Sequence, residues 1–187
     1  MSTASLRRDH DLIEKVLKSM AATVQLLESG KAVPAPILNQ VIDFTKNFTD
    51  VCHHAKEEES LFPALQSVGV PSRMGPIPVM LMEHRQSREI AAEMEGRARE
   101  YLESGEYGPL ATSMRRYVQH VTEHLWKENN RLFVMAEARL QRAASKVSEE
   151  MDEIERRRLE ELGRERAHYE RIVSDLDGMV RDVSRSV

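Results

Sequence analysis

Five long stretches of this sequence space their apolar residues as an α-helix does, and short breaks of glycine and proline separate them. The stretches cover about residues 5–28, 36–68, 78–104, 109–144 and 147–183. No stretch alternates apolar and polar residues with a period of two, so we predict no strands. Short connections between long helices favour antiparallel neighbours. We therefore predict an all-α fold, an antiparallel four-helix bundle with an additional C-terminal helix.

The last stretch is predicted to extend the bundle. We place the bundle at residues 1–145 and the helical extension at residues 146–187. Gly163 and Gly178 are weak points of this helix. Its apolar stripe can dock on the bundle or on a second copy of the chain, so we expect a monomer or a homodimer. The stripe consists of Val147, Met151, Ile154, Leu159, Leu162, Tyr169, Ile172, Leu176 and Val180.

The composition narrows the range of partners. Charged residues make up 31% of the 187 residues, and the net charge is −4. A nucleic acid or an anionic membrane calls for an excess of basic residues, so we expect neither as a partner. No apolar run is long enough to span a bilayer, and the first residues lack the apolar stretch of a signal peptide. The single cysteine excludes an internal disulfide framework. These features predict a cytoplasmic protein.

Two histidine–glutamate pairs have the spacing that brings side chains together on a helix. His54 and Glu58 are four residues apart, and so are His124 and Glu128. Each pair directs an imidazole and a carboxylate to one point, a combination that suits a first-row metal such as iron or zinc. His10 and His84 lie on the apolar stripes of two other helices. Four helices would thus each offer an inward histidine to a two-metal site in the bundle core.

The second helix contains adjacent histidines and a run of three glutamates, and only some of these side chains can face the inside of the bundle. His54 and Glu58 follow the spacing of three and four residues that a buried row on an α-helix requires. We assign both to the inside of the bundle. His53 and Glu57, one position earlier, are assigned to the outer side.

The set as a whole indicates a metal site. A lone histidine on an apolar stripe is more often a hydrogen-bonded core residue than a ligand. A buried carboxylate, however, is costly unless it is paired or bound to a metal, and here two follow histidines at core positions. The predicted ligands are His10, His54, Glu58, His84, His124 and Glu128. His120 fits a further ligand, a supporting group or a surface residue, and Cys52 fits a small buried residue.

The order of these residues resembles the hemerythrin-like proteins, the HHE cation-binding domains. In that family a histidine, a His-x3-Glu pair, a histidine and a second pair follow one another on four helices. The stretches His54–Pro63 and His124–Phe133 are similar to the two signature stretches of the family. The resemblance covers about residues 6–140, and residues 151–176 resemble the helical extension often found after such domains.

The resemblance implies a non-haem centre of two iron ions with an oxo or hydroxo bridge. Glu58 and Glu128 would bridge the ions, and the four predicted histidines would be terminal ligands. The oxygen carriers of the family have five histidines, two of them one turn apart on the third helix. Here Met80 and Arg88 stand one turn either side of His84. This departure predicts open metal positions, at which oxygen, peroxide or nitric oxide exchange or react.

Other metal and catalytic classes lack their motifs here. Ferritin-like di-iron proteins place a glutamate three residues before a histidine, where this chain has Val51, Leu81 and Val121. The zinc-peptidase motif, the phosphate loop, the nucleophile elbow and the dinucleotide fingerprint are absent. Two functions remain. One is a protein that binds or senses oxygen, nitric oxide, peroxide or iron; the other is a di-iron enzyme that consumes hydrogen peroxide or reduces nitric oxide. The sequence shows no separate general acid or reductase module, which favours binding.

Overall fold

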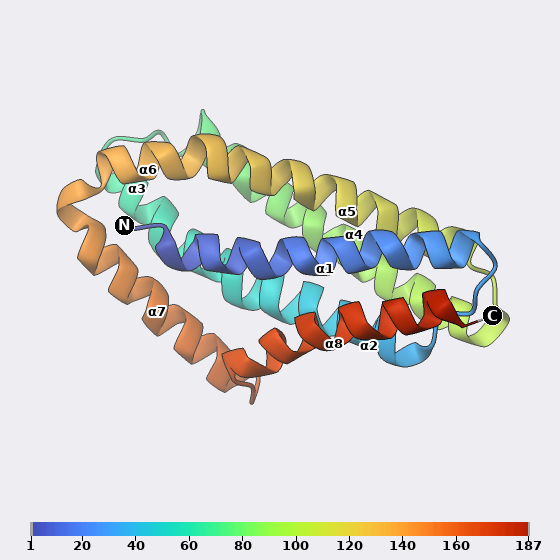
Figure 1. Cartoon of the computed structure of the whole chain (residues 1–187). Coiled ribbons are helices and arrows are strands. Elements are labelled where there is room, and N and C mark those ends of the chain that lie inside the picture. Colours follow the sequence, from blue (N-terminus) through green and yellow to red (C-terminus); the bar gives the residue numbers. More distant parts are fainter. Residues whose placement is uncertain (1, 187) are drawn as a thin grey trace.

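The computed structural model describes residues 2–186, and within them it contains helices and no strands. Four long helical rods run antiparallel, as the sequence predicted (Figure 1). The first rod is α1 (Ala4–Glu28), and the third is α4 (Pro76–Ser104). The second rod joins α2 (Ala35–Asp43), η1 (Phe44–His54), η2 (Glu57–Leu61) and α3 (Phe62–Ser67). The fourth joins α5 (Gly108–Lys127), η3 (Glu128–Leu132) and α6 (Phe133–Arg139).

Glycine and proline end and start the rods where the sequence placed them. Gly105 follows α4 in the left-handed conformation, with φ +77°, and its N–H donates to the carbonyl of Tyr101 at 2.8 Å. Glycine adopts this conformation without the penalty of a Cβ atom. Prolines stand in the first turns of α2, α4 and α5, where a missing N–H removes no helical hydrogen bond.

The C-terminal extension that follows the bundle consists of two helices, which form a hairpin. A short turn, η4 (Gln141–Ala143), leads into α7 (Ala144–Glu161), and α8 (Arg166–Arg185) follows. The chain breaks at Gly163, which has φ +61°, whereas Gly178 lies inside α8. Figure 1 shows the two helices as an open V whose second arm lies along α1 and α2. All residues of the predicted docking stripe are buried on the bundle except Leu162, which is half-buried. The predicted division after residue 145 falls inside α7 and stays a prediction.

The second rod is wider than an α-helix over about half of its length. η1 and η2 are π-helical, with hydrogen bonds from residue i to i+5 and more residues per turn than an α-helix. Buried residues there include adjacent pairs that recur every four residues. The pairs are Phe44 and Thr45, Phe48 and Thr49, Cys52 and His53, Lys56 and Glu57, and Ser60 and Leu61. The inner face of this rod therefore differs from that of a regular α-helix.

The apolar core consists of two clusters with a polar layer between them. The larger cluster includes Ile13 of α1, Phe48 of η1 and Ile90 of α4. The smaller one, near the N-terminal end of α1, includes Leu6, Leu61 and Met80. On every rod, histidines or glutamates occupy the positions between the two clusters. The clusters exclude water from both ends of this layer.

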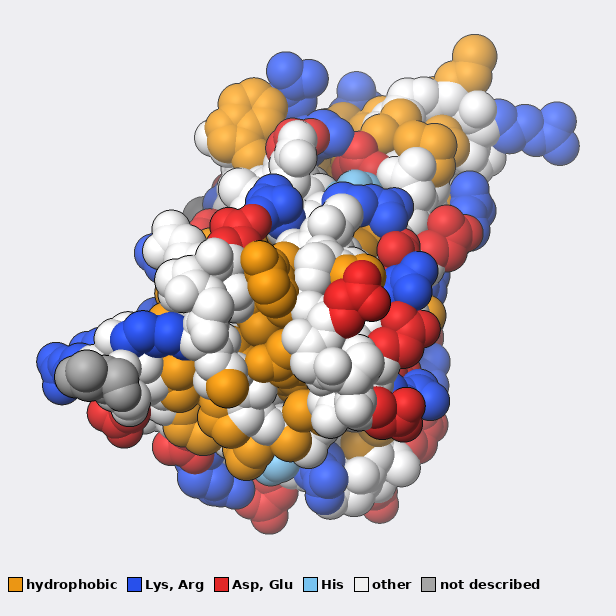
Figure 2. Space-filling model, turned by 90° about the vertical axis from the view of Figure 1, so that its right-hand side faces the viewer, with side chains coloured by type: hydrophobic (Ala, Val, Ile, Leu, Met, Phe, Trp, Pro, Cys, Tyr) orange, Lys and Arg blue, Asp and Glu red, His pale blue; other side chains and the backbone are white. Residues whose placement is uncertain are grey.

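The surface is mixed in character. Figure 2 views the end of the bundle at which α8 finishes, where hydrophobic side chains lie among both signs of charge. None of the described helices combines the length and the apolar character needed to cross a membrane.

Candidate metal centre

Seven inner side chains make up the polar layer, which we call the ligand layer. None of them is more than 2% exposed. They are His10 of α1, His53 and His54 of η1, Glu57 of η2, His84 of α4, His124 of α5 and Glu128 of η3.

The ligand layer forms two groups of four that share both carboxylates. His10 and His53 lie with Glu57 and Glu128, and one ligand atom from each is within 4.8 Å of every other. His84 and His124 meet the same two glutamates under the same limit. We call the first group position one and the second group position two. Two neighbouring positions with common carboxylates are the arrangement of a bridged two-metal site.

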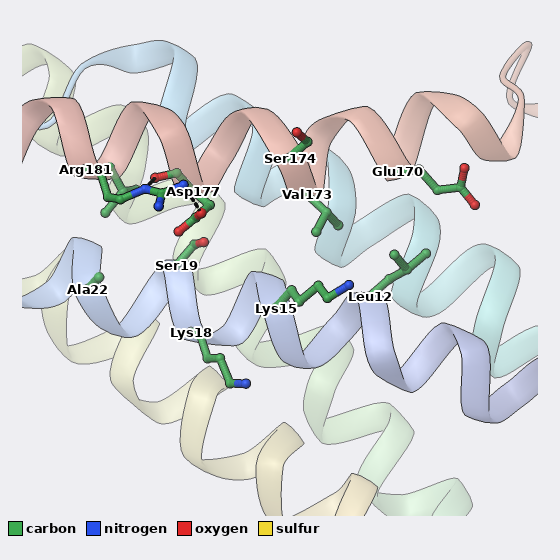
Figure 3. Close-up of a pocket in the computed structure, with 11 residues that line it drawn as sticks. Leu12, Lys15, Lys18, Ser19, Ala22, Glu170, Val173, Ser174, Asp177 and Arg181 are labelled. Carbon is green, nitrogen blue, oxygen red and sulfur yellow. Dashed lines mark hydrogen bonds and ion pairs between the residues drawn. The ribbon is translucent and has the colours of Figure 1, made fainter.

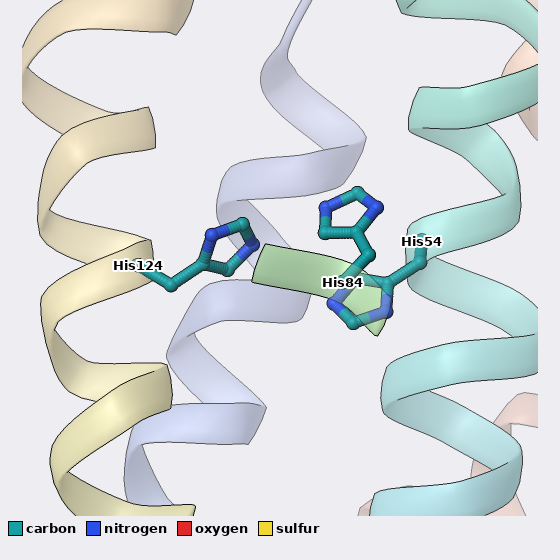
Figure 4. Close-up of side chains that lie close together, drawn as sticks. All are labelled: His54, His84 and His124. Atoms are coloured by element: carbon teal, nitrogen blue, oxygen red, sulfur yellow. The ribbon is translucent and has the colours of Figure 1, made fainter. Parts of the chain in front are cut away.

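A third imidazole, that of His54, lies beside position two. The ligand nitrogens of His54, His84 and His124 lie within 4.8 Å of one another. Figure 4 shows the three rings pointing toward one another from three different rods. The rings of His54 and His84 stack, with centroids 3.9 Å apart and planes 11° apart. Four inner imidazoles were predicted, including His54, and the one that was not predicted is His53 of position one.

The atoms that face the centre of the ligand layer have no hydrogen-bond partners among residues 2–186. This holds for Nε2 of all five histidines and for both carboxylate oxygens of Glu57 and Glu128. Some of them approach one another: Nε2 of His124 is 3.2 Å, and Nε2 of His10 3.3 Å, from Glu128 oxygens. A buried carboxylate without a partner is costly. Cations at the two positions would satisfy these imidazole and carboxylate atoms together, so the residues present fit a metal centre.

The opposite nitrogen, Nδ1, of every inner histidine is held by an outer partner. His10 lies 3.0 Å from the side-chain oxygen of Asn129, and His84 lies 2.8 Å from a carboxylate oxygen of Glu58. The corresponding partners of His53, His54 and His124 are Asp9 at 3.3 Å, Asp50 at 3.2 Å and Glu83 at 2.9 Å. Such contacts fix the ring orientation and leave Nε2 free for a metal.

Two assignments made from the sequence on the second rod are wrong. Glu57, at 0% exposure, points into the ligand layer, whereas Glu58 accepts hydrogen bonds from His84 and from Arg88 at 2.7 Å and remains 28% exposed. His53 was assigned to the outside and is fully buried in position one. The sequence assignment assumed an α-helical repeat, but η1 and η2 are π-helical and have more residues per turn, so the α-helical row drifts off the inner face. The buried row that continues is Thr45, Thr49, His53 and Glu57. The inward assignment of His54 agrees with its burial.

A closed ring of four charges supports position one; we call it the ion ring. Lys56 lies 2.5 Å from both Asp9 and Glu155 of α7. Arg166 of α8 closes the ring at 2.9 Å from Asp9 and 2.8 Å from Glu155. Burial opposes the charge of Lys56, but the two carboxylates outweigh it and raise its pKa. The C-terminal hairpin thus supplies half of the charges that hold Asp9 beside His53.

The outer partners of position two belong to the bundle alone. Arg88 of α4 donates to Asp50 at 2.6 Å as well as to Glu58. Lys127 forms an ion pair with Glu83. Two of its three carboxylates, those of Asp50 and Glu58, are 26% and 28% exposed, and Glu83 is 7% exposed. At position one, Asp9 is 1% exposed and Asn129 is half-buried. This side of the ligand layer is in closer contact with solvent.

The comparison with protein families agrees with this geometry. A profile of the hemerythrin HHE cation binding domain matches residues 1–136. The chain belongs to the hemerythrin HHE family. The match contains the whole ligand layer of this HHE domain and stops before α7. No curated protein and no solved structure matches the chain. The protein is a helical metal-binding protein, and its histidine and glutamate groups are compatible with that role.

The protonation of the metal-free HHE domain reflects the mutual influence of these groups. Burial disfavours charge on His124, but Glu128 outweighs it and raises the pKa of His124 to about 9. The carboxylates around His84 likewise hold its pKa well above the usual value against the effect of burial. Burial and the neighbouring imidazoles lower the pKa of His54 well below its usual value. Protons on His84 and His124 thus offset the buried carboxylates until cations replace them.

The two residues left open by the sequence lie outside the ligand layer. His120 is half-buried, and its Nε2 lies 2.9 Å from the backbone carbonyl of Glu83. It thus contacts the residue that holds His124. Cys52 is buried as a free thiol, and burial raises its pKa to about 12, so it remains protonated.

Proposed function

We propose that this HHE domain binds two iron ions, one at each position, with Glu57 and Glu128 between them. The observation that carries the proposal is that both carboxylates belong to both groups of inner atoms. Two divalent or trivalent cations a few ångströms apart repel each other strongly in a buried site. Neutral imidazoles cannot offset that repulsion, and two shared carboxylates can.

The remaining ligands follow from the same groups. His10 and His53 would hold the ion at position one. His84 and His124 would hold the ion at position two, with His54 as a third imidazole. Imidazole and carboxylate together suit iron, and family membership favours iron over zinc. Bound iron would supply reversible redox chemistry and affinity for small oxygen- or nitrogen-containing molecules.

We further propose that the centre binds or senses oxygen, nitric oxide or peroxide. Every titratable side chain of the ligand layer is used in the two positions, which leaves no separate acid or base in that layer for a catalytic cycle. The second candidate is a di-iron enzyme that consumes hydrogen peroxide or reduces nitric oxide. It is favoured by a cavity that reaches His54, since turnover requires repeated exchange of small molecules.

Anaerobic titration of the metal-free protein with ferrous iron tests the proposal. We expect two equivalents to bind, with a Mössbauer spectrum typical of coupled high-spin iron after oxidation. The folded protein would contradict the proposal if it bound one equivalent or none. Added peroxide then separates the two candidates: a binding protein reacts about once per centre, whereas an enzyme consumes many equivalents.

A further inference from the structure

A cavity of about 280 Å³ lies beside position two, between η1, α4 and α5. Its inner wall contains the ring of His54 and the side chain of Tyr117, both almost completely buried. Its rim includes Ala92, which is exposed. The cavity therefore leads from the surface to an imidazole of the ligand layer.

The walls of this cavity select against ions. Val51, Ala91 and Tyr117 supply apolar surface. The charged groups in the lining are already paired: Arg88 with Asp50 at 2.6 Å, and Lys46 with Glu95 at 2.5 Å. An entering anion would have to break one of these pairs to reach Arg88 or Lys46, and an entering cation would have to break one to reach a carboxylate. A small uncharged molecule meets no such cost.

A larger cavity lies elsewhere and does not reach the centre. It has about 670 Å³ and lies between α1 and α8, with Ala22, Lys15 and Asp177 among its lining (Figure 3). None of its lining residues belongs to the ligand layer. Although this cavity is larger, it has no contact with the ligand layer. A substitution in its lining therefore serves as a control for substitutions in the cavity at His54.

We propose that the cavity at His54 is the entry route by which small uncharged molecules, such as nitric oxide, oxygen and hydrogen peroxide, reach position two. The inference rests on the proposed iron centre and adds to it the side of approach and the charge of the ligand. Ala91 and Ala92 set the width of the route, and Arg88 closes it to ions by remaining paired.

Stopped-flow binding of nitric oxide to the reduced, iron-loaded protein tests the route. Ala92→Trp narrows the rim, and we expect the association rate to fall about tenfold while iron content stays at that of the wild type. Val51→Ala widens the cavity and should raise the rate. Ala22→Trp places the same bulk in the groove between α1 and α8 and should leave the rate unchanged.

Equal association rates in all four proteins would overturn the route and leave the iron centre intact. If Ala92→Trp lost iron, the rate for Val51→Ala would decide the matter, because an enlarged cavity removes no contact with a proposed ligand. A wild-type protein without iron would contradict the proposed function, and the route with it. Iron content measured first therefore separates the two failures.

The ion ring carries a second inference, independent of the cavity. Glu155 and Arg166 come from the C-terminal hairpin, outside the residues matched to the family profile. Through Lys56 and Asp9 they fix the carboxylate that faces Nδ1 of His53. We infer that Glu155 and Arg166 are positioning residues for the ion at position one. Because coupling between two sites is reciprocal, metal at position one should also stabilise the docked hairpin.

Chelator competition on the variants Glu155→Gln and Arg166→Met tests this inference. We expect one of the two iron equivalents to bind about tenfold more weakly and the other to be unchanged. Arg166→Lys should restore part of the loss. The control is Glu153→Gln, which breaks an exposed ion pair with Arg156 on the same helix.

Unchanged affinity of both equivalents, or equal weakening of both, would overturn the assignment to position one. Hydrogen exchange of the wild type gives a second measure that needs no variant. Iron loading should slow amide exchange in α8, and equal exchange with and without iron would contradict the coupling.

Discussion

The two positions of the ligand layer have similar inner atoms and different surroundings. At position one, Asp9 holds His53 and is 1% exposed inside the ion ring. At position two, Asp50 and Glu58 hold His54 and His84 and are more than a quarter exposed. The cavity that we propose as an entry route adjoins position two only.

This difference in surroundings indicates that the inner ligands alone do not set the role of each metal position. A rigid, buried outer partner favours retention of a metal, because the ligand cannot reorient without breaking ion pairs. A partner near solvent and beside a cavity leaves room for a small molecule to approach. We therefore expect position one to hold its metal more firmly than position two.

The largest effect should come from the two carboxylates that both positions share. Glu57→Gln combined with Glu128→Gln should abolish iron binding, since no anion then remains between the ions. Each single variant should bind about one equivalent or less, as measured by atomic absorption on folded protein. Glu58→Gln is the matched control and should retain close to two equivalents. Loss of iron in the control equal to that in Glu57→Gln would show that the inner face of η2 is assigned wrongly.

The adjacent histidines of η1 separate the positions most directly. His53→Ala should remove the ion at position one, leaving about one equivalent of iron, because only His10 then remains as an imidazole there. His54→Ala should retain close to two equivalents, since His84 and His124 still hold position two. The variant His54→Ala should nevertheless change the absorption spectrum of the centre. The opposite order of iron loss would exchange the roles that we give to the two residues.

The outer partners should differ in their effect on stability. Asp9→Asn breaks a buried network and should lower the free energy of unfolding of the metal-free protein by about 3 kcal/mol. Asp50→Asn removes a partly exposed partner of Arg88 and should cost about 1 kcal/mol or less. Urea unfolding followed by circular dichroism measures both. Similar losses in the two variants would remove the distinction between a closed and an open side.

A further expected effect is a dependence of stability on pH that arises at position two. The pKa of His124 is raised to about 9, above the value of about 6.5 for an unfolded histidine. This group therefore stabilises the metal-free protein fully below pH 6.5, and the contribution is lost as the pH rises through 9. Iron affinity should rise over the same interval, because protons no longer compete. His124→Gln should flatten the stability curve, and a wild-type stability that rises from pH 6.5 to 9 would contradict the assignment.

The sequence predicted most of the bundle and part of the centre. The four rods begin and end close to the expected residues, because glycine and proline mark their ends. His10, His84 and His124 lie inside as predicted, since α1, α4 and α5 keep the regular α-helical repeat. Within the second rod, the assumption of the same repeat chose Glu58 in place of Glu57. The sequence did hold a signal, because His53 and Glu57 are also four residues apart, in line with Thr45 and Thr49.

The surroundings of the ligands depend on contacts that no local pattern reveals. The ion ring joins residues 9, 56, 155 and 166, and its members come from four different helical segments. The inner imidazole that was not predicted, His53 of position one, comes from the second rod, whereas the resemblance to oxygen carriers directed attention to the third. Packing of the rods brings these residues together. The spacing of residues within one rod cannot predict which residues of other rods they will contact.

The division of the apolar core into two clusters has a consequence for how the protein matures. Each cluster is formed by hydrophobic contacts that need none of the ligand-layer side chains. We therefore expect the chain to fold before any metal binds, in contrast to small zinc domains that are unfolded without their metal. A newly made chain would then be folded but metal-free. The supply of metal, and not the rate of synthesis, would set how much of the protein carries a complete centre.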